Sequence, residues 1–437
     1  DEIRELYGTY YFNLGEISFG KKLFTLGSVD ENSPIDHFNP YNYYYLLIGG
    51  TDKKIGVNSL SFDFYFNNFT LRGAVSPNHN LNYYPNNDSE YSLSLPISPE
   101  QYLFLDNKGS EHESFLSFQT NINNNTEITL THLRAFDRVF SLSGFTMHEF
   151  TGPYIEVLDN FVLPDGNGET QNPGTWFSYR LTESLSLGFV KLFEDFIIRA
   201  DVAHFHSFDR YEIEDYQNFR SLQDYEYSEL DPNHSDIYNV FNDQYNIDGE
   251  CSGDNLQGCN DLFIAPLNEN VKYSQLTFQI ELPLPNDWQF NMQFFKYDLL
   301  RYDITNYTFE DVVVNLPLVT IDLNEVINDD GDFFNPGFGS SMSSLSQKSI
   351  LLGIDKKLFD NNLQASITSF FDLDKGNGKL ISFELDYQIN DSMNFIFGGT
   401  TIFNDESVIS TSFIDPGYIF NIMEDFSHNR IQFNYYF

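Results

Sequence analysis

The sequence predicts an all-β fold, a transmembrane antiparallel β-barrel of about sixteen strands, with roughly fourteen and eighteen as limits. Residues 1–437 are expected to form this single domain. Three observations predict the barrel. The closing residues alternate between apolar and polar side chains, the composition is aromatic without long apolar runs, and short turns alternate with long connections along the chain.

The closing segment, residues 428–437, has the two-residue period of a strand. One face carries Ile431, Phe433, Tyr435 and Phe437, and the other carries Arg430, Gln432, Asn434 and Tyr436. A strand with lipid on one side and water on the other has this pattern, and its aromatic end belongs in the interfacial girdle. We therefore expect hydrocarbon against the apolar face.

The composition agrees with alternating strands. The chain has 45 Phe and 28 Tyr, an aromatic content of 17%, and a mean hydropathy of −0.35. We find no stretch of about 18 uninterrupted apolar residues, which excludes helical membrane spans. Barrel strands give a low mean hydropathy because half of their side chains face the lumen.

Net charge excludes one class of partner. The formal charge of −41 is opposite in sign to the basic surface that nucleic-acid binding requires. Such an excess of acidic side chains attracts cations. Two interpretations stay open: a functional cation preference, or an acidic solvated protein from a salty habitat.

Strands of alternating polarity are predicted in hairpins with short turns. Their ranges are 2–14 with 16–26, 59–66 with 69–75, 114–122 with 127–136, 177–193 with 196–207, 272–282 with 288–302, 347–359 with 363–371, and 380–389 with 393–404. The opposite ends carry mostly long connections, at 27–54, 77–113, 138–175, 208–270, 303–345 and 405–427, with a short one at 372–378. This asymmetry is typical of a transmembrane barrel with tight periplasmic turns and long, here acidic, extracellular loops.

The direction of the end strands adds a constraint. Counting gives about fifteen strands, so the first and the last run the same way and cannot close an antiparallel barrel. We therefore expect a further strand upstream of Asp1, or a miscount in a long segment such as 176–193. Since no signal peptide precedes Asp1, the chain is expected to be a mature exported protein.

The opening residues 3–27, I-R-E-L-Y-G-T-Y-Y-F-N-L-G-E-I-S-F-G-K-K-L-F-T-L-G, precede D-H-F-N-P at 36–40 and K-I-G-V-N-S-L-S-F-D at 54–63. This part, about residues 2–75, resembles a family of Gram-negative outer-membrane barrels distantly akin to the alginate exporter. The stretch from Gly20 to Gly27 and the loop residues Asp36, Asn39 and Pro40 match that family. The resemblance implies a porin-like barrel and transport, with no particular cargo.

Charged residues on the predicted inward faces are the candidates for lining a pore. They are Asp63, Arg72, Arg180, Arg199, Asp201, Glu281, Glu384, Asp386 and Arg430. Facing charges create a transverse field that orients polar solutes, or form cross-strand pairs that only stabilise the interior. The connection 27–54 is long enough to fold inward, and its constriction candidates are Asp36, Asn39, Tyr43, Tyr44 and Tyr45.

Two further sites are candidates in the long connections. Asp329, Asp330 and Asp332 cluster oxygen ligands around a glycine, as a structural Ca²⁺ prefers, although a solvated acidic turn explains them too. Cys251 and Cys259 are spaced for a small disulfide loop in an oxidising compartment. No other cofactor is predicted.

These features predict a channel of the bacterial outer membrane for passive or facilitated diffusion of small hydrophilic solutes, with cations favoured by an acidic mouth. Its partners would be lipid, lipopolysaccharide and small polar solutes, but no nucleic acid; a homo-oligomer or a partner protein at the loops stays open. The alternative is a plugged barrel acting as a structural anchor or surface-binding subunit. No enzyme is predicted, because no Ser/His/Asp spacing occurs and His204 and His206 fit an interfacial girdle.

Overall fold

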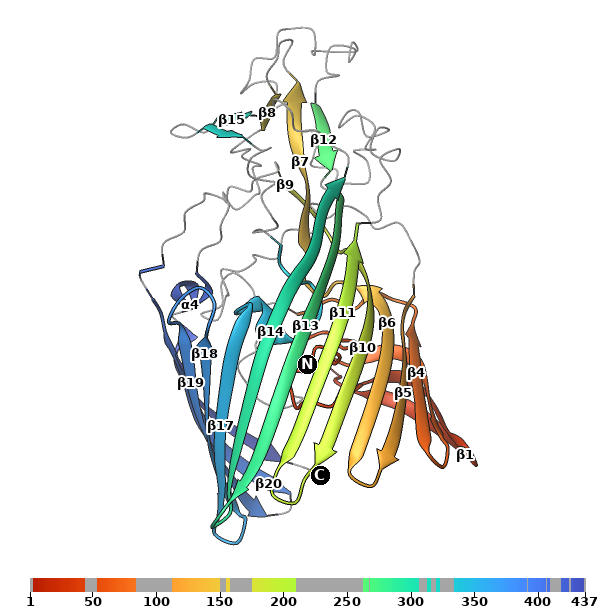
Figure 1. Cartoon of the computed structure of the whole chain (residues 1–437), viewed down its shortest axis with the longest axis vertical. Helices are drawn as coiled ribbons and strands as arrows, with labels where there is room; N and C mark the ends of the chain where they lie inside the picture. Colours follow the sequence, from red (N-terminus) through yellow and green to blue (C-terminus); the bar gives the residue numbers. More distant parts are fainter. Residues whose placement is uncertain are drawn as a thin grey trace.

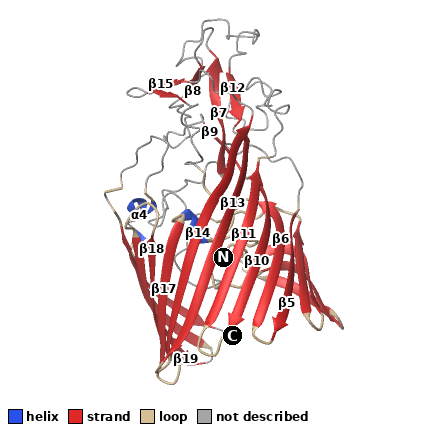
Figure 2. Ribbon diagram, in the orientation of Figure 1, coloured by secondary structure: helices blue, strands red, loops and turns tan. Residues whose placement is uncertain are grey.

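The fold is that of a computed structural model, which describes residues 3–43, 53–83, 112–149, 155–157, 175–209, 262–266, 268–305, 313–315, 320–322, 334–390, 392–405, 407–408, 418–423 and 426–435. Strands dominate this part of the chain (Figure 2). Within it, no helix is long and apolar enough to cross a membrane.

Fifteen strands form one antiparallel sheet, which curves around an interior (Figure 1). In spatial order they are β1 (Leu6–Phe12), β2 (Gly15–Lys22), β3 (Val57–Tyr65), β4 (Phe69–Ser76), β5 (Glu113–Asn123), β6 (Thr126–Phe136), β10 (Leu181–Leu192), β11 (Ile197–Phe208), β13 (Asn268–Leu284), β14 (Trp288–Thr305), β17 (Lys348–Leu358), β18 (Leu363–Asp372), β19 (Lys379–Asn390), β20 (Met393–Phe403) and β21 (His428–Tyr435). The all-β antiparallel fold and every expected hairpin are confirmed.

Short turns join the hairpins at one end of the sheet, as predicted. Asn286 and Asp287 connect β13 to β14 with positive φ of 62° each, a conformation that Asn and Asp tolerate better than other side chains. Long connections lie at the opposite end, where β13 and β14 also extend furthest (Figure 1).

The two faces of the sheet differ in polarity. On β21, Ile431 is 72% exposed and Phe433 58% exposed, whereas the alternate residues, from Arg430 to Asn434, face the concave side. The other strands repeat this pattern with Leu60, Leu116, Leu130, Leu185, Leu187, Val202, Ile367 and Leu385 on the exposed face. Soluble proteins rarely expose a contiguous apolar surface of this extent.

Several boundaries differ from the prediction. The segment 177–193 is two strands, because β9 (Thr175–Ser178) ends before Arg180 and pairs with β7 (Ser141–Glu149) in a second sheet with β8 (Ile155–Val157) and β12 (Leu262–Pro266). The strand expected at 16–26 stops at Lys22, where the chain turns inward. Short elements also lie in the connections: β15 (Val313–Asn315), β16 (Thr320–Asp322), the 3₁₀ helix η4 (Ser341–Ser344) and α4 (Ile419–Ile422).

The two edges of the large sheet are β1 and β21. Each runs from the end with long connections toward the end with short turns, so they point the same way, as the strand count predicts. The sheet is therefore not closed by an antiparallel pair between its own edges.

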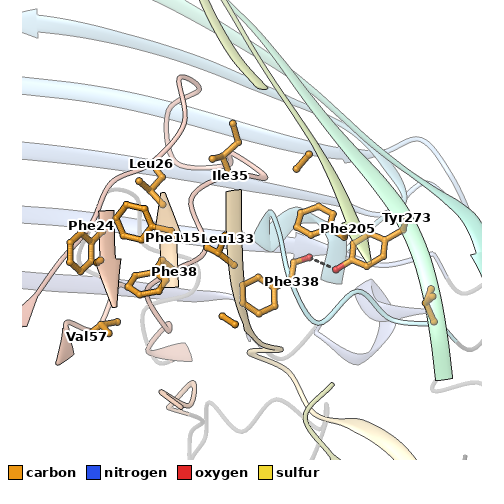
Figure 3. Close-up of a cluster of buried hydrophobic side chains, with 14 of the residues drawn as sticks. Phe24, Leu26, Ile35, Phe38, Val57, Phe115, Leu133, Phe205, Tyr273 and Phe338 are labelled. Atoms are coloured by element: carbon orange, nitrogen blue, oxygen red, sulfur yellow. Dashed lines mark hydrogen bonds between the residues drawn. The ribbon is translucent and has the colours of Figure 1, made fainter. Parts of the chain in front are cut away.

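The concave side of the sheet contains an apolar core (Figure 3). Phe24, Leu26, Ile35 and Phe38 come from the connection between β2 and β3, and Phe338 comes from a second inward segment before β17. They pack against Phe115, Leu133, Phe205 and Tyr273 of the wall. Part of the interior is thus filled by the chain itself.

Candidate functional site: the lumen and its inward loops

The first inward loop, residues 23–43, is shaped by the D-H-F-N-P motif. The Asn39 side chain accepts from the Phe24 amide at 2.8 Å and donates to the Ile55 carbonyl at 2.7 Å. The Asp36 carboxylate accepts from the Leu26 amide at 3.1 Å and forms a buried ion pair with Lys54. Both motif residues therefore hold the base of the loop together, because they satisfy backbone groups that would otherwise be buried unpaired.

The tip of this loop is fastened to the wall at Asp201 of β11. The carboxylate accepts from the backbone amides of Ser28 at 2.8 Å and Val29 at 2.9 Å, and from the Ser33 hydroxyl at 2.6 Å. Gly27 precedes the tip with a φ of 84°, which favours glycine. Hydrogen bonds to a charged acceptor are strong, so these three contacts fix the loop tip to the wall. We call this set of contacts the Asp201 clasp.

Amide side chains of β13 and β14 extend the attachment. Gln279 accepts from the Asp30 amide at 3.0 Å, and Gln293 donates to the Asp30 carbonyl at 2.8 Å and accepts from the Asn32 side chain at 2.8 Å. Thr277 donates to the Asn32 carbonyl at 2.9 Å. The inward polar residues of these strands therefore bind the loop.

Arg138 joins both inward loops. Its guanidinium donates to both carboxylate oxygens of Glu113, at 2.7 and 3.0 Å, and to the Phe38 carbonyl of the first loop at 2.7 Å. Its backbone amide donates to the Gly337 carbonyl of the second inward segment at 2.9 Å. A single buried cation thus connects the wall with two segments that are distant in sequence.

Arg180 fastens the second inward segment, residues 334–346. Its guanidinium donates to Asp137 at 2.9 Å, to Glu269 at 2.7 Å and to the Asn335 carbonyl at 2.9 Å. The half-buried Asp209 lies beside this cluster and accepts from the Glu269 amide at 3.0 Å. Burial and the nearby Glu269 carboxylate raise the pKa of Asp209 to about 7.

His37, inside the same motif, is a packing residue. Its ring lies 4.6 Å from the ring of Phe338 and 5.4 Å from that of Phe205. Burial, with the nearby charges of Arg138 and Lys54, lowers the pKa of His37 to about 3. The imidazole is therefore neutral where it contacts these rings.

The predicted pore-lining charges lie on the concave side, mostly in ion pairs. Arg72 pairs with Asp63 at 2.6 Å, and Arg199 pairs with Glu281. Arg430 of β21 pairs with Glu384 of β19 across Gly398 of β20, which lies in register with both. Because Gly398 has no side chain, the guanidinium reaches over the intervening strand.

The remaining predicted residues have other positions. Asp201 holds the first loop, Arg180 holds the second, and Asp386 accepts from the Asn394 side chain at 3.0 Å. Tyr43 is the last residue of the first loop, and its amide donates to the Tyr83 carbonyl at 2.8 Å. Tyr44, Tyr45, Asp329, Asp330, Asp332, Cys251 and Cys259 lie outside the described residues.

A cavity of about 450 Å³ remains between the inward loops and the strands β17–β21. The loop side contributes Glu31, Asn32 and Lys53, and the wall contributes Glu384, His428 and Arg430. Phe370 and Leu380 lie between this cavity and a second apolar cluster that includes Phe420 of α4. In the part of the chain that the structure describes, unfilled space therefore lies beside β17–β21.

Sequence reasoning missed several of these residues. Ser382 and Thr400 also line the cavity. Their inward positions follow from the two-residue period, but nothing in the pattern distinguishes them from other small polar residues. Arg138 and Lys53 lie in connections, where no period places a side chain. Among the connections, only the D-H-F-N-P loop carries a usable signal.

Neither a protein-family model nor a curated protein sequence matches the chain. Among solved structures it is similar to OccK8 (OprE) of Pseudomonas aeruginosa, with 9% identity, a TM-score of 0.35, and coverage of 91% of this chain and 75% of that one. OpdK of Pseudomonas aeruginosa, crystallised with vanillate, has 10% identity and a TM-score of 0.38, with coverage of 91% of this chain and 73% of that one. OccAB4 of Acinetobacter baumannii has 6% identity and a TM-score of 0.38, with coverage of 91% of this chain and 70% of that one. The resemblance of residues 2–75 to alginate-exporter-like barrels stays a prediction.

Proposed function

We propose that the protein is an outer-membrane channel through which small hydrophilic solutes diffuse, without catalysis. The observation that carries this proposal is the difference between the two faces of the curved sheet. The convex face exposes apolar side chains, whereas the concave face carries Ser, Thr and Gln side chains and ion-paired charges beside the apolar core. A membrane strand must satisfy its backbone within a sheet and turn apolar groups to lipid. Short turns would then face the periplasm, and long loops the exterior.

The inward loops support sieving as the mechanism. The Asp201 clasp and the Arg138 contacts hold residues 23–43 against the wall, so the free cross-section is reduced on the side of β11–β14. Solutes would pass along β17–β21, where the cavity lies. The net charge of −41 would enrich cations at the mouth.

The test is conductance of the purified protein in a planar lipid bilayer, with the reversal potential measured across a KCl gradient. We expect discrete current steps and a cation preference that weakens at high salt, since exposed charges are screened over about 10 Å at 0.1 M and about 3 Å at 1 M. Anion preference would contradict the role of the acidic mouth, and absence of any current would contradict the channel.

The packing of both loops inside the sheet favours a second candidate, a plugged barrel that anchors a partner at its surface. The same bilayer experiment separates the two. A plugged barrel inserts into the membrane without carrying current, and the variant Asp201→Asn leaves it silent.

A further inference from the structure

The cavity beside β17–β21 has the size of a binding site for a small molecule. Its volume is about 450 Å³, within the range of about 300–1,000 Å³ typical of ligand pockets. Three chain segments face the wall across it: the tip of the first inward loop, Lys53 before β3, and η4 with the following Leu345. It is therefore built by distant parts of the chain.

Charges in the cavity cancel. Glu31 and Lys53 come from the loop side, and Glu384 and Arg430 form an ion pair on the wall. Their formal sum, −1 + 1 − 1 + 1, is zero, in contrast to −41 for the whole chain. A solute with a single net charge gains little from such a set, because each attractive group has a repulsive neighbour.

Hydroxyl groups line the wall between these charges. Ser382 of β19 and Thr400 of β20 share a hydrogen bond of 2.8 Å, and Ser366 and Thr368 of β18 lie beside the same cavity. Hydroxyls donate and accept. Together with carboxylates that only accept and a guanidinium that only donates, they complement a solute whose own groups also do both.

The cavity also has an apolar part. It is formed by Met342, Leu345, Leu351, Phe370, Leu380 and Phe383, and the polar side chains of Asn32, Ser341 and His428 complete the lining. An apolar surface next to a hydrogen-bonding surface suits a ring with a C–H face and a rim of hydroxyls, since the face is removed from water while the rim keeps its partners.

We propose that this cavity binds an uncharged, multiply hydroxylated solute of one or two rings, a mono- or disaccharide, as it crosses the lumen. The inference rests on the proposed channel and specifies the solute class that this part of the lumen selects. The acidic mouth concentrates cations, and the neutral cavity slows sugars.

The experiment is block of the ion current in planar bilayers by glucose and maltose, compared with glucosamine and glucuronate as a cation and an anion with the same ring. We expect glucose and maltose to reduce the current in a saturable way, and the charged analogues to act at least about tenfold more weakly, the factor expected for roughly one uncompensated polar group. Stronger block by either charged analogue would overturn the proposal.

A matched pair of variants locates the effect. Ser382→Ala with Thr400→Val removes the hydroxyl pair in the cavity, and Ser117→Ala with Thr131→Val removes a pair with the same 2.8 Å separation between β5 and β6. We expect the first double variant to raise the half-blocking sugar concentration about tenfold and the second to leave it unchanged. Equal effects of the two would refute the assigned place of binding.

The outcome stays informative if no current flows. The proposed channel then fails, and calorimetric titration of the detergent-solubilised protein with maltose decides the inference alone. The site is supported if maltose binds and if the cavity variant, but not the β5–β6 variant, weakens that binding. Absence of any heat of binding would contradict the proposed site. Circular dichroism of each variant checks that the sheet is retained.

Discussion

Asp201 is the residue on which the position of the first inward loop depends most. Its carboxylate holds two backbone amides and one hydroxyl. In Asp201→Asn the charge is lost and an NH₂ group faces some of those donors. We expect the free energy of unfolding to fall by about 1.5–3 kcal/mol and the single-channel conductance to rise, measured by urea unfolding and in planar bilayers.

The control for this variant is Asp386→Asn. Asp386 is also a carboxylate of the concave face, but its partner in the described structure is Asn394 on the neighbouring strand, not the loop. It should leave the conductance close to that of the parent. Equal conductance of Asp201→Asn and the parent would show that the clasp does not set the width of the passage.

Asp209 makes stability depend on pH. Burial and the neighbouring Glu269 raise its pKa from 3.8 to about 7 in the folded protein. Between these two values the folded state holds a proton that the unfolded state has lost, so stability decreases as the pH rises from about 4 to about 7. The groups around it include the carboxylates of Glu269 and Asp137 and the guanidinium of Arg180.

The comparison that isolates this effect is Asp209→Asn. An amide keeps the shape without titrating, so the melting temperature of the variant should fall less than that of the parent between pH 4 and pH 7. Parallel profiles for both proteins would mean that Asp209 titrates normally. Calorimetry in detergent provides the measurement.

At this scale the sequence predicts which face a strand residue occupies but not its partner. The period of two places Asp63 and Arg72 inward, and the observed register makes them neighbours. Asp201 also points inward as expected, yet its partners are loop amides that no pattern in the sequence identifies. Loop conformation depends on packing within the lumen, which local periodicity does not record.

At the scale of elements, the hairpins are the predictable part of the molecule. Alternation and short turns, most of them with Asn or Asp, predict all the strands of the large sheet to within about four residues at each end. The connections were not predictable in this way. Thus β7 and β9, which pair with each other outside the large sheet, were expected to be loop and part of a barrel strand.

The depth of an outward residue in the bilayer should decide how much a charged substitution at that residue destabilises the barrel. Leu130 lies at the middle of β6, is 45% exposed and points outward, whereas Ile122, 62% exposed, is next to the last residue of β5 beside the short turn. We expect Leu130→Arg to lower the free energy of unfolding by about 2–4 kcal/mol, and Ile122→Arg to lower it by about 0–1 kcal/mol, the values for the middle and the edge of the hydrocarbon layer. Unfolding from lipid vesicles measures both.

If both substitutions cost the same, the exposed apolar face does not lie in a bilayer. A soluble sheet would tolerate arginine at either exposed position, because both side chains would then be in water. Both residues belong to the β5–β6 hairpin and expose an apolar side chain, and Ile122 lies at the register shift between Asn121 and Asn123.

At the scale of the whole molecule, β1 and β21 are the two edges of the large sheet and run in the same direction, so they cannot form an antiparallel pair with each other. We propose that one more strand, antiparallel to both, lies between them and completes a sixteen-stranded barrel. Hydrogen exchange in vesicles should then protect the outer-edge amides of β21 as strongly as those shared with β20. Rapid exchange at alternate residues of β21 would indicate a free edge.

The central claim is that the convex face contacts hydrocarbon and the concave face contacts water. Spin labels placed one at a time at residues 428–435 of the reconstituted protein measure this directly, through their collisions with oxygen and with a water-soluble nickel complex. We predict that the accessibility alternates along the strand. Collisions with oxygen should dominate for labels at residues 431, 433 and 435, and collisions with the nickel complex for labels at residues 430, 432 and 434. Accessibility to nickel at every position, or no two-residue period, would contradict the account.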